Sequence, residues 1–139
     1  MNANAPGTLF KLSETEEIVR QPDEDIRGRD VRDRDGEELG TVKDLLVDGA
    51  ENRVRFMEVA SGGFLGIGKD TTLIPIDAIT SITEDEVRID QTRERVAGAP
   101  AYDPELVRRQ EDYGGFLEYY GFMPFWGGGY VYPGYPYYR

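Results

Sequence analysis

Apolar and polar residues alternate along residues 25–90, and turn-forming residues interrupt this alternation at short intervals. The turn signals are Asp35-Gly36, Asp48-Gly49 and a glycine cluster at residues 62–68. Short alternating runs separated by such turns are typical of the strands of a small barrel or sandwich. The pattern therefore predicts an all-β core for this part of the chain.

The expected strands cover residues 26–32, 38–48, 53–60 and 72–76, and a final pair contains Ile79, Ile82, Val87 and Ile89. In the first strand, Ile26 and Val31 are five positions apart, so a strict period of two fails. This indicates a bulge or kink near Gly28.

Residues 53–60 alternate cleanly and carry apolar side chains on both faces. Val54, Phe56 and Glu58 are expected on one face, and Met57 on the other. A strand that is apolar on both faces is expected at the centre of a closed barrel with further structure packed outside it.

Four segments follow from these patterns. Residues 1–24 form an N-terminal extension, in which Ser13 and Glu16 have the spacing of a helix capping box. Residues 25–104 form the barrel domain. Asp103-Pro104 has the form of a helix start, so residues 105–112 are expected to be a short helix that Gly114-Gly115 ends. Residues 113–139 form a separate C-terminal segment.

This C-terminal segment, the aromatic tail, holds twelve of the sixteen aromatic residues and only one acid, Glu118. Tyrosine and tryptophan are effective anchors in protein interfaces, which favours an adhesive role for the tail. Disorder is one alternative. Stacking on single-stranded nucleic acid is another, but that platform needs basic residues between the rings, and the only base is Arg139. The predicted interaction residues of the tail are Tyr119, Tyr120, Phe122, Phe125, Trp126, Tyr130 and Tyr132.

The glycine-rich loop at residues 63–70 presents Phe64, Leu65 and Ile67, which either cap the barrel end or form a contact patch. The loop is close to a phosphate-binding loop. However, Asp70 stands where a hydroxyl should bind magnesium, and a strand follows instead of a helix. Nucleotide binding is therefore not expected.

The composition contains no cysteine and no histidine, and the net charge is -11. The commonest metal ligand and the commonest general base are both missing, so we expect no catalytic residues, no metal site, no cofactor and no small-molecule substrate. Around Asp33-Arg34-Asp35-Gly36, an EF-hand loop would lack its ligands at Val31 and Val42. Four arginines at residues 27–34 alternate with acids and predict a self-neutralising strand face, so nucleic acid is a disfavoured partner.

Neither a signal peptide nor an apolar run of the ~20 residues needed to cross a bilayer is recognisable. We expect no transmembrane segment and a cytoplasmic location.

Several short motifs recur in order along the core. They are Asp25-Ile26-Arg27-Gly28, Asp35-Gly36-Glu37, Leu39-Gly40-Thr41-Val42, Asp44-Leu45-Leu46-Val47-Asp48, Gly63-Phe64-Leu65-Gly66-Ile67-Gly68, Leu73-Ile74-Pro75-Ile76 and Ala99-Pro100-Ala101-Tyr102-Asp103. Across residues 9–104 the sequence resembles the PRC-barrel family, which includes the cytoplasmic domain of the photosynthetic reaction-centre H subunit and the C-terminal domain of a ribosome-maturation factor. The resemblance implies a small antiparallel β-barrel that acts as an adaptor and not as an enzyme.

The sequence thus predicts a small antiparallel PRC-type β-barrel with short flanking helices and an aromatic tail. Its predicted function is that of a non-catalytic adaptor, a homo-oligomer or part of a larger protein assembly, which binds through the barrel surface and the tail. The alternatives are a ribosome- or RNA-associated factor and an accessory to a membrane electron-transfer complex.

Overall fold

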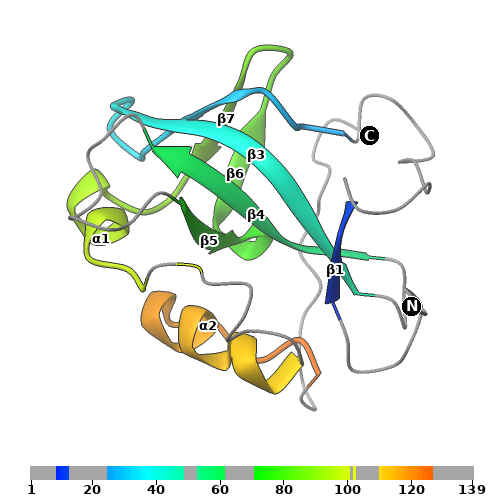
Figure 1. Ribbon diagram of the computed structural model, residues 1–139. Coiled ribbons are helices and arrows are strands. Elements are labelled where there is room, and N and C mark those ends of the chain that lie inside the picture. Colours follow the sequence, from blue (N-terminus) through cyan, green and yellow to red (C-terminus); the bar gives the residue numbers. More distant parts are fainter. Residues whose placement is uncertain are drawn as a thin grey trace.

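The computed structural model describes residues 9–12, 25–48, 53–61, 71–100, 102 and 110–126. Within these residues, seven strands form one curved sheet (Figure 1). They are β1 (Leu9–Lys11), β2 (Asp30–Arg32), β3 (Glu38–Asp48), β4 (Arg53–Ser61), β5 (Thr71–Pro75), β6 (Ile79–Ile82) and β7 (Glu86–Ile89). This confirms the predicted small all-β fold.

The long strand β3 organises the sheet, because β4, β2 and β1 all pair with it. The strand order is β5-β4-β3-β2-β7-β6, with β1 added beside β3. A 3-10 turn, η3 (Ile76–Ala78), joins β5 to β6 and thus links the two ends of this order. The pairs are antiparallel except for β2 and β7, which run parallel. A parallel pair needs a long connection, and here the chain between β2 and β7 includes four other strands.

Two apolar clusters lie on opposite sides of the sheet. The interior cluster includes Val31, Leu45, Met57, Ile74 and Ile89. The outer cluster lies on the other side of β3, β4 and β5, and its members are Leu9, Leu46, Phe56, Leu73, Tyr113, Phe116, Leu117 and Phe125. The expected burial of the 53–60 strand from both sides is therefore confirmed.

A register shift in β4 corrects the predicted alternation of this strand. Leu46 pairs with Phe56 and Val47 pairs with Val54, so Arg55 is an extra residue in β4. Such a bulge changes which face the neighbouring side chains occupy. Val54 packs against the interior cluster while Phe56 belongs to the outer cluster, so the two do not share a face.

The first strand is shorter than predicted. It spans only Asp30–Arg32, and residues 27–28 form a turn in which Gly28 has a φ of +89°. The kink expected near Gly28 is confirmed. Ile26 precedes the turn and is nevertheless fully buried in the interior cluster.

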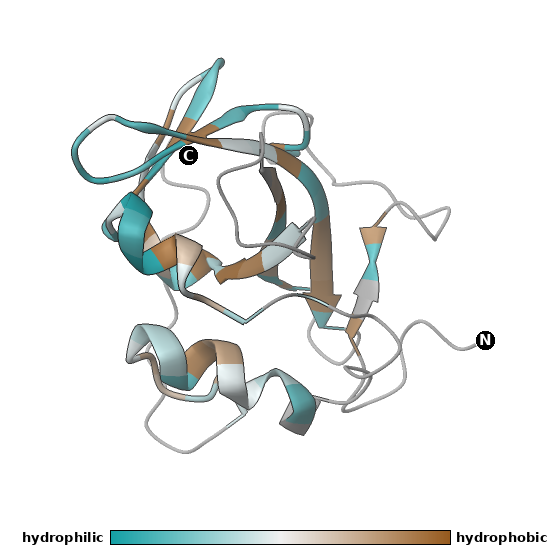
Figure 2. Cartoon of the chain, turned by 60° about the vertical axis from the view of Figure 1, so that its left-hand side comes forward, coloured by the Kyte–Doolittle hydropathy of each residue, from teal (hydrophilic) through white to brown (hydrophobic). Residues whose placement is uncertain are grey.

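Two α-helices accompany the sheet, α1 (Arg93–Ala97) and α2 (Gly114–Tyr120), and a 3-10 turn, η4 (Gln110–Tyr113), leads into α2. Both views show α2 at one side of the sheet (Figures 1 and 2). The prediction that Gly114-Gly115 ends a helix is wrong, because α2 begins there. Most of the predicted 105–112 helix and the capping box at residues 13–16 lie outside the described residues.

Candidate functional site

Residues 110–126, the C-terminal strap, lie across the outer face of β3, β4 and β5. Phe56 of β4 is the centre of this contact and is fully buried. The Tyr113 ring stacks on the Phe56 ring with centroids 5.2 Å apart, and Phe116 and Phe125 approach it edge-on at 6.4 Å. Three rings from the strap therefore enclose one ring from the sheet. Aromatic pairs of this kind contribute about 0.5–1.5 kcal/mol each beyond the area they bury.

A buried ion pair lies beside these rings. The Arg55 Nη2 atom is 3.0 Å from Asp48 Oδ2, and the two side chains are 2% and 7% exposed. The guanidinium carbon of Arg55 lies 4.4 Å from the centroid of the Phe125 ring. The strap thus shields both the apolar and the charged residues of this face from water.

A second ion pair joins β1 to β4. Lys11 Nζ is 3.4 Å from Glu58 Oε1, and the Glu58 side chain is 3% exposed. The ammonium group also lies 5.2 Å from the ring centroid of Tyr102. Glu58 is opposite Leu73 in the sheet register, so this charge borders the outer cluster.

The sequence of α2 explains why the strap folds onto this face. Phe116, Leu117 and Tyr120 are spaced to form one apolar side of a helix, and all three are buried. Gly121 ends the helix with a φ of +81°, which is favourable for glycine. The Phe122 amide then donates to the Leu117 carbonyl, which turns the chain back toward the sheet.

The strap is also attached to α1. The Tyr119 hydroxyl donates to the Arg95 carbonyl at 2.6 Å, and the Arg95 guanidinium donates to the Tyr119 carbonyl. Thr92 caps α1 by accepting from the Arg95 amide. A Cβ added at Gly98 would lie 2.9 Å from the Tyr119 hydroxyl, so a side chain at this position would displace that hydroxyl.

Tyr120 connects the strap to the barrel interior. Its side chain belongs to the interior cluster, whereas Phe116 and Leu117 belong to the outer one. Burial raises the pKa of the Tyr120 hydroxyl well above its ordinary value, and the neighbouring Tyr119 adds to this effect. The hydroxyl has no hydrogen-bond partner in the described part of the chain. Tyr120 is therefore a neutral core residue.

The structure separates the predicted interaction residues into three groups. Tyr120 and Phe125 are buried within the chain itself. The half-buried residues are Tyr119, Phe122 and Trp126. The residues outside the described ranges are Phe64, Leu65, Ile67, Tyr130 and Tyr132.

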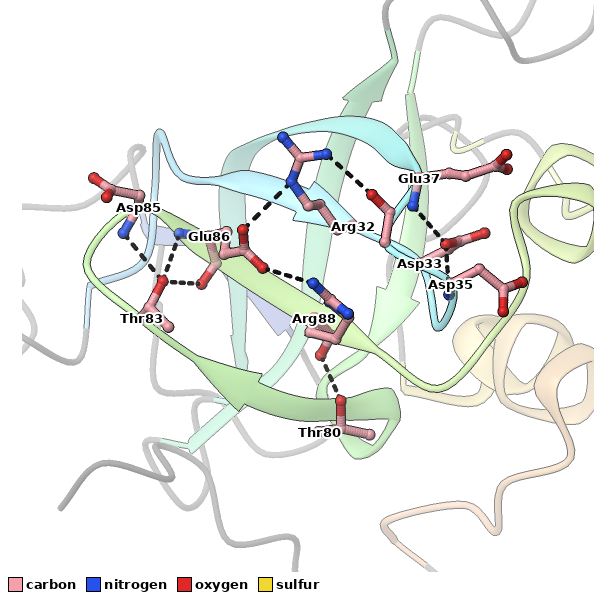
Figure 3. Close-up of polar contacts among 10 residues, drawn as sticks. Arg32, Asp33, Asp35, Glu37, Thr80, Thr83, Asp85, Glu86 and Arg88 are labelled. Carbon is pink, nitrogen blue, oxygen red and sulfur yellow. Dashed lines mark hydrogen bonds and ion pairs between the residues drawn. The ribbon is translucent and has the colours of Figure 1, made fainter.

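The arginine-rich face of β2 and β7 is polar and internally paired (Figure 3). The carboxylate of Glu86 lies between Arg32 and Arg88, at 3.4 and 3.3 Å. Arg32 also donates to the Gly36 carbonyl. One acid thus serves two arginines. Among the four arginines at residues 27–34, Arg27 pairs with Asp25, as the alternation of charges predicts, whereas Arg32 pairs with Glu86 of β7.

Asp33 organises the turn between β2 and β3. Its carboxylate accepts hydrogen bonds from the amides of Asp35, Glu37 and Arg93, at 2.8, 2.8 and 2.9 Å. Burial alone would raise the pKa of Asp33, but these amide donors outweigh it and hold the pKa below its ordinary value. The tight turn predicted in place of a calcium loop is present, and it also positions the start of α1.

Among the described residues, no group of three or more acids is placed to hold a metal ion. Within the same ranges, no helix is long and apolar enough to span a membrane.

The charged residues of the outer face were not identified from the sequence. Asp48 and Arg55 lie seven positions apart and only the bulge in β4 brings them together. Glu58 could have been identified more easily than Asp48 and Arg55, because the alternation of residues 53–60 placed it on the same face as Phe56.

A model of the PRC-barrel domain matches residues 22–96, which is more than half of the chain. No curated protein matches the chain. The matched range contains every strand from β2 to β7 and ends in α1, whereas the strap lies beyond it. Because the match covers the strands that build the barrel and enclose its interior cluster, the chain belongs to the PRC-barrel family.

Proposed function

We propose that this chain is a non-catalytic assembly protein that associates with further copies of itself, and through the same surface with partner proteins. PRC-barrel domains are in general of a protein-interaction type and are generally non-catalytic. The proposed contact surface is the exposed margin of the strap together with the tyrosines that follow it.

The observation that carries this proposal is the exposure of Met123. Met123 is 54% exposed and is the exposed large hydrophobic residue of the described ranges, and in the sequence it stands between Phe122 and Trp126, whose side chains are half-buried. Thioether and aromatic side chains are enriched in protein interfaces and adapt well to different partners. The chain continues from here with Tyr130 and Tyr132 and a single charge, Arg139.

The glycine-rich loop belongs to the same proposal. It joins the end of β4 to the start of β5, and the Thr71 carbonyl at that start accepts from the Tyr102 amide at 3.1 Å. Thr71, which follows the loop, and Tyr102, which precedes the segment that leads to the strap, are therefore adjacent. In this proposal, contact residues of the loop and of the tail act on one partner.

RNA binding is not favoured by the arrangement of charges. A nucleic-acid surface needs unpaired basic side chains, whereas Arg32 and Arg88 share Glu86. The net charge of -11 opposes the approach of any polyanion.

The test is the mass of the full chain in solution, measured by light scattering over a range of concentrations. We expect a multiple of the 15.7 kDa chain mass. Met123→Asp and the double change Tyr130→Ser, Tyr132→Ser should lower it, since both remove apolar contact surface. Ser81→Asp is the matched control, because it adds the same charge on an exposed position of β6. A full chain that scatters as a single copy throughout would refute the proposal.

A further inference from the structure

The strap can leave the barrel without breaking the sheet. The seven strands of the described residues lie between residues 9 and 89, and the strap at residues 110–126 contributes none of them. The amides of Gly121 and Phe122, which follow α2, donate to carbonyls within α2. Departure of the strap therefore removes side-chain contacts and leaves the strand pairing in place. Segments of this kind can open locally, at a lower free energy than unfolding of the whole domain.

The strap has little structure of its own. Its helix α2 is seven residues long, begins with Gly114 and Gly115, and has no side-chain cap from Tyr113. Isolated helices shorter than about 12–15 residues are marginal in water, and glycine destabilises them further. The order of the strap therefore depends on its contacts with the barrel and with α1.

Tyr119 joins the strap to a fixed point on the barrel. Its hydroxyl donates to the Arg95 carbonyl at 2.6 Å, and the Arg95 guanidinium donates back to the Tyr119 carbonyl. The guanidinium carbon also lies 4.5 Å from the centroid of the Tyr119 ring. Arg95 is part of α1, whose first amide, that of Arg93, donates to the Asp33 carboxylate. The buried side chain of Val96 fixes α1 to the interior cluster, so these contacts favour the closed strap.

The next residue opposes closure through its hydroxyl. Tyr120 packs among the apolar side chains of the interior cluster, and its hydroxyl is buried with no hydrogen-bond partner in the ranges that the structure describes. A buried hydroxyl without a partner loses its hydration and gains no hydrogen bond in return. When the strap opens, this hydroxyl regains hydrogen bonds to water. The Tyr120 hydroxyl therefore favours the open strap, whereas its ring favours the closed one.

The ion pair beneath the strap acts in the same direction as the Tyr120 hydroxyl. Asp48 and Arg55 are buried, and the Phe125 ring of the strap lies against the Arg55 guanidinium. Burying an ion pair costs the hydration of both charges. Opening of the strap restores part of this hydration and so offsets part of the cost of exposing Phe56.

We propose that the strap is a lid over the outer face of β3, β4 and β5, which opens while the barrel stays folded. Tyr119 holds this lid closed through α1, and the Tyr120 hydroxyl favours its release. Opening uncovers Phe56 and the other sheet residues of the outer cluster. The inference does not rest on the proposed self-association, because every contact in it lies within one chain.

The test is amide hydrogen exchange of the full chain, followed residue by residue by NMR at several urea concentrations below the unfolding transition. The Phe122 amide reports on the strap, and the Met57 amide reports on the barrel, because β4 is paired on both sides. We expect the Phe122 amide to be about tenfold or more less protected than that of Met57, and to depend less on urea, since local opening exposes less surface than unfolding. Equal protection and equal urea dependence at the two amides would overturn the lid.

Two matched variants separate the roles of the two tyrosines, because each deletes one hydroxyl oxygen from neighbouring residues of α2. Tyr119→Phe removes the hydrogen bond to α1 and should speed exchange of the Phe122 amide about fivefold. Tyr120→Phe removes the hydroxyl without a partner and should slow that exchange about tenfold. Glu118→Gln, an exposed change on α2, is the control and should leave the rate unchanged.

The outcomes are distinct for the lid and for the proposed function. Faster exchange in Tyr120→Phe would mean that the hydroxyl stabilises the closed strap, and an unchanged rate in Tyr119→Phe would mean that α1 does not hold it. Either result would overturn the proposal. Both variants keep Met123 and the tyrosines that follow it, so light scattering of a single copy at every concentration would contradict the proposed function and leave the lid standing.

Discussion

Truncation of Phe56 to alanine should destabilise the strap more than the barrel. The Phe56 ring is fully buried, and all three rings in contact with it belong to the strap. A buried Phe→Ala change typically costs 3–5 kcal/mol, and the lost ring pairs place this site near the middle, at about 4 kcal/mol. Such a loss is a large part of the roughly 5–15 kcal/mol that stabilises a domain.

The assay is urea unfolding at one fixed protein concentration, followed by two probes. Trp126 emission reports on the strap, because its ring lies 4.8 Å from that of Phe125, and circular dichroism reports on the sheet. In Phe56→Ala we expect the tryptophan transition to occur at lower urea than the transition of the sheet. The change should separate two transitions that coincide in the unmodified chain.

Met57→Ala is the matched control, since Met57 is the next residue of β4, is equally buried, and faces the interior cluster. It should cost about 2–5 kcal/mol and lower both transitions together. The reasoning would be refuted if Phe56→Ala changed the free energy of unfolding by less than about 1 kcal/mol, or if its two probes remained superimposed.

Three further changes test other contacts. Asp33→Ala should cost roughly 2–4 kcal/mol in chemical unfolding, because it leaves three amides without their acceptor. In the unmodified chain the pKa of Asp33 lies below its ordinary value of 3.8, so the stability that its carboxylate contributes is present above pH 3.8 and is lost as the pH falls below that value. Acid unfolding of Asp33→Asn, compared with that of the unmodified chain, checks this. Arg55→Ala should lower the free energy of unfolding by about 3–5 kcal/mol in thermal unfolding, because it removes the cation that neutralises buried Asp48. The double change Arg55→Met, Asp48→Leu should be near neutral. Equal losses of stability in the two variants would contradict this account. Gly98→Ala should break the hydrogen bond from Tyr119 to α1 at a cost of about 1 kcal/mol and speed amide exchange in α2, and unchanged exchange rates there would exclude the contact.

The barrel strands could be predicted because their signals are local. Residues 38–48 form the predicted strand with the same limits. The strand at 53–61 is one residue longer than predicted, and the strand at 71–75 is shifted by one residue at both ends. Alternation determines which residues can be buried together, and turn residues determine where a strand stops. The first strand was predicted too long because Ile26 is buried from a turn and not from a strand.

The amino-acid sequence by itself determined the barrel class, the turn at Asp33 and the change of composition at Tyr113. Only the tertiary structure decided the position of the strap and the bulge of β4 at Arg55. That bulge brings Arg55 to Asp48 as its ion-pair partner. The physical reason is separation along the chain. Phe56 meets Tyr113 across 57 positions, and no local periodicity encodes which of two apolar faces a distant, glycine-rich aromatic segment will cover.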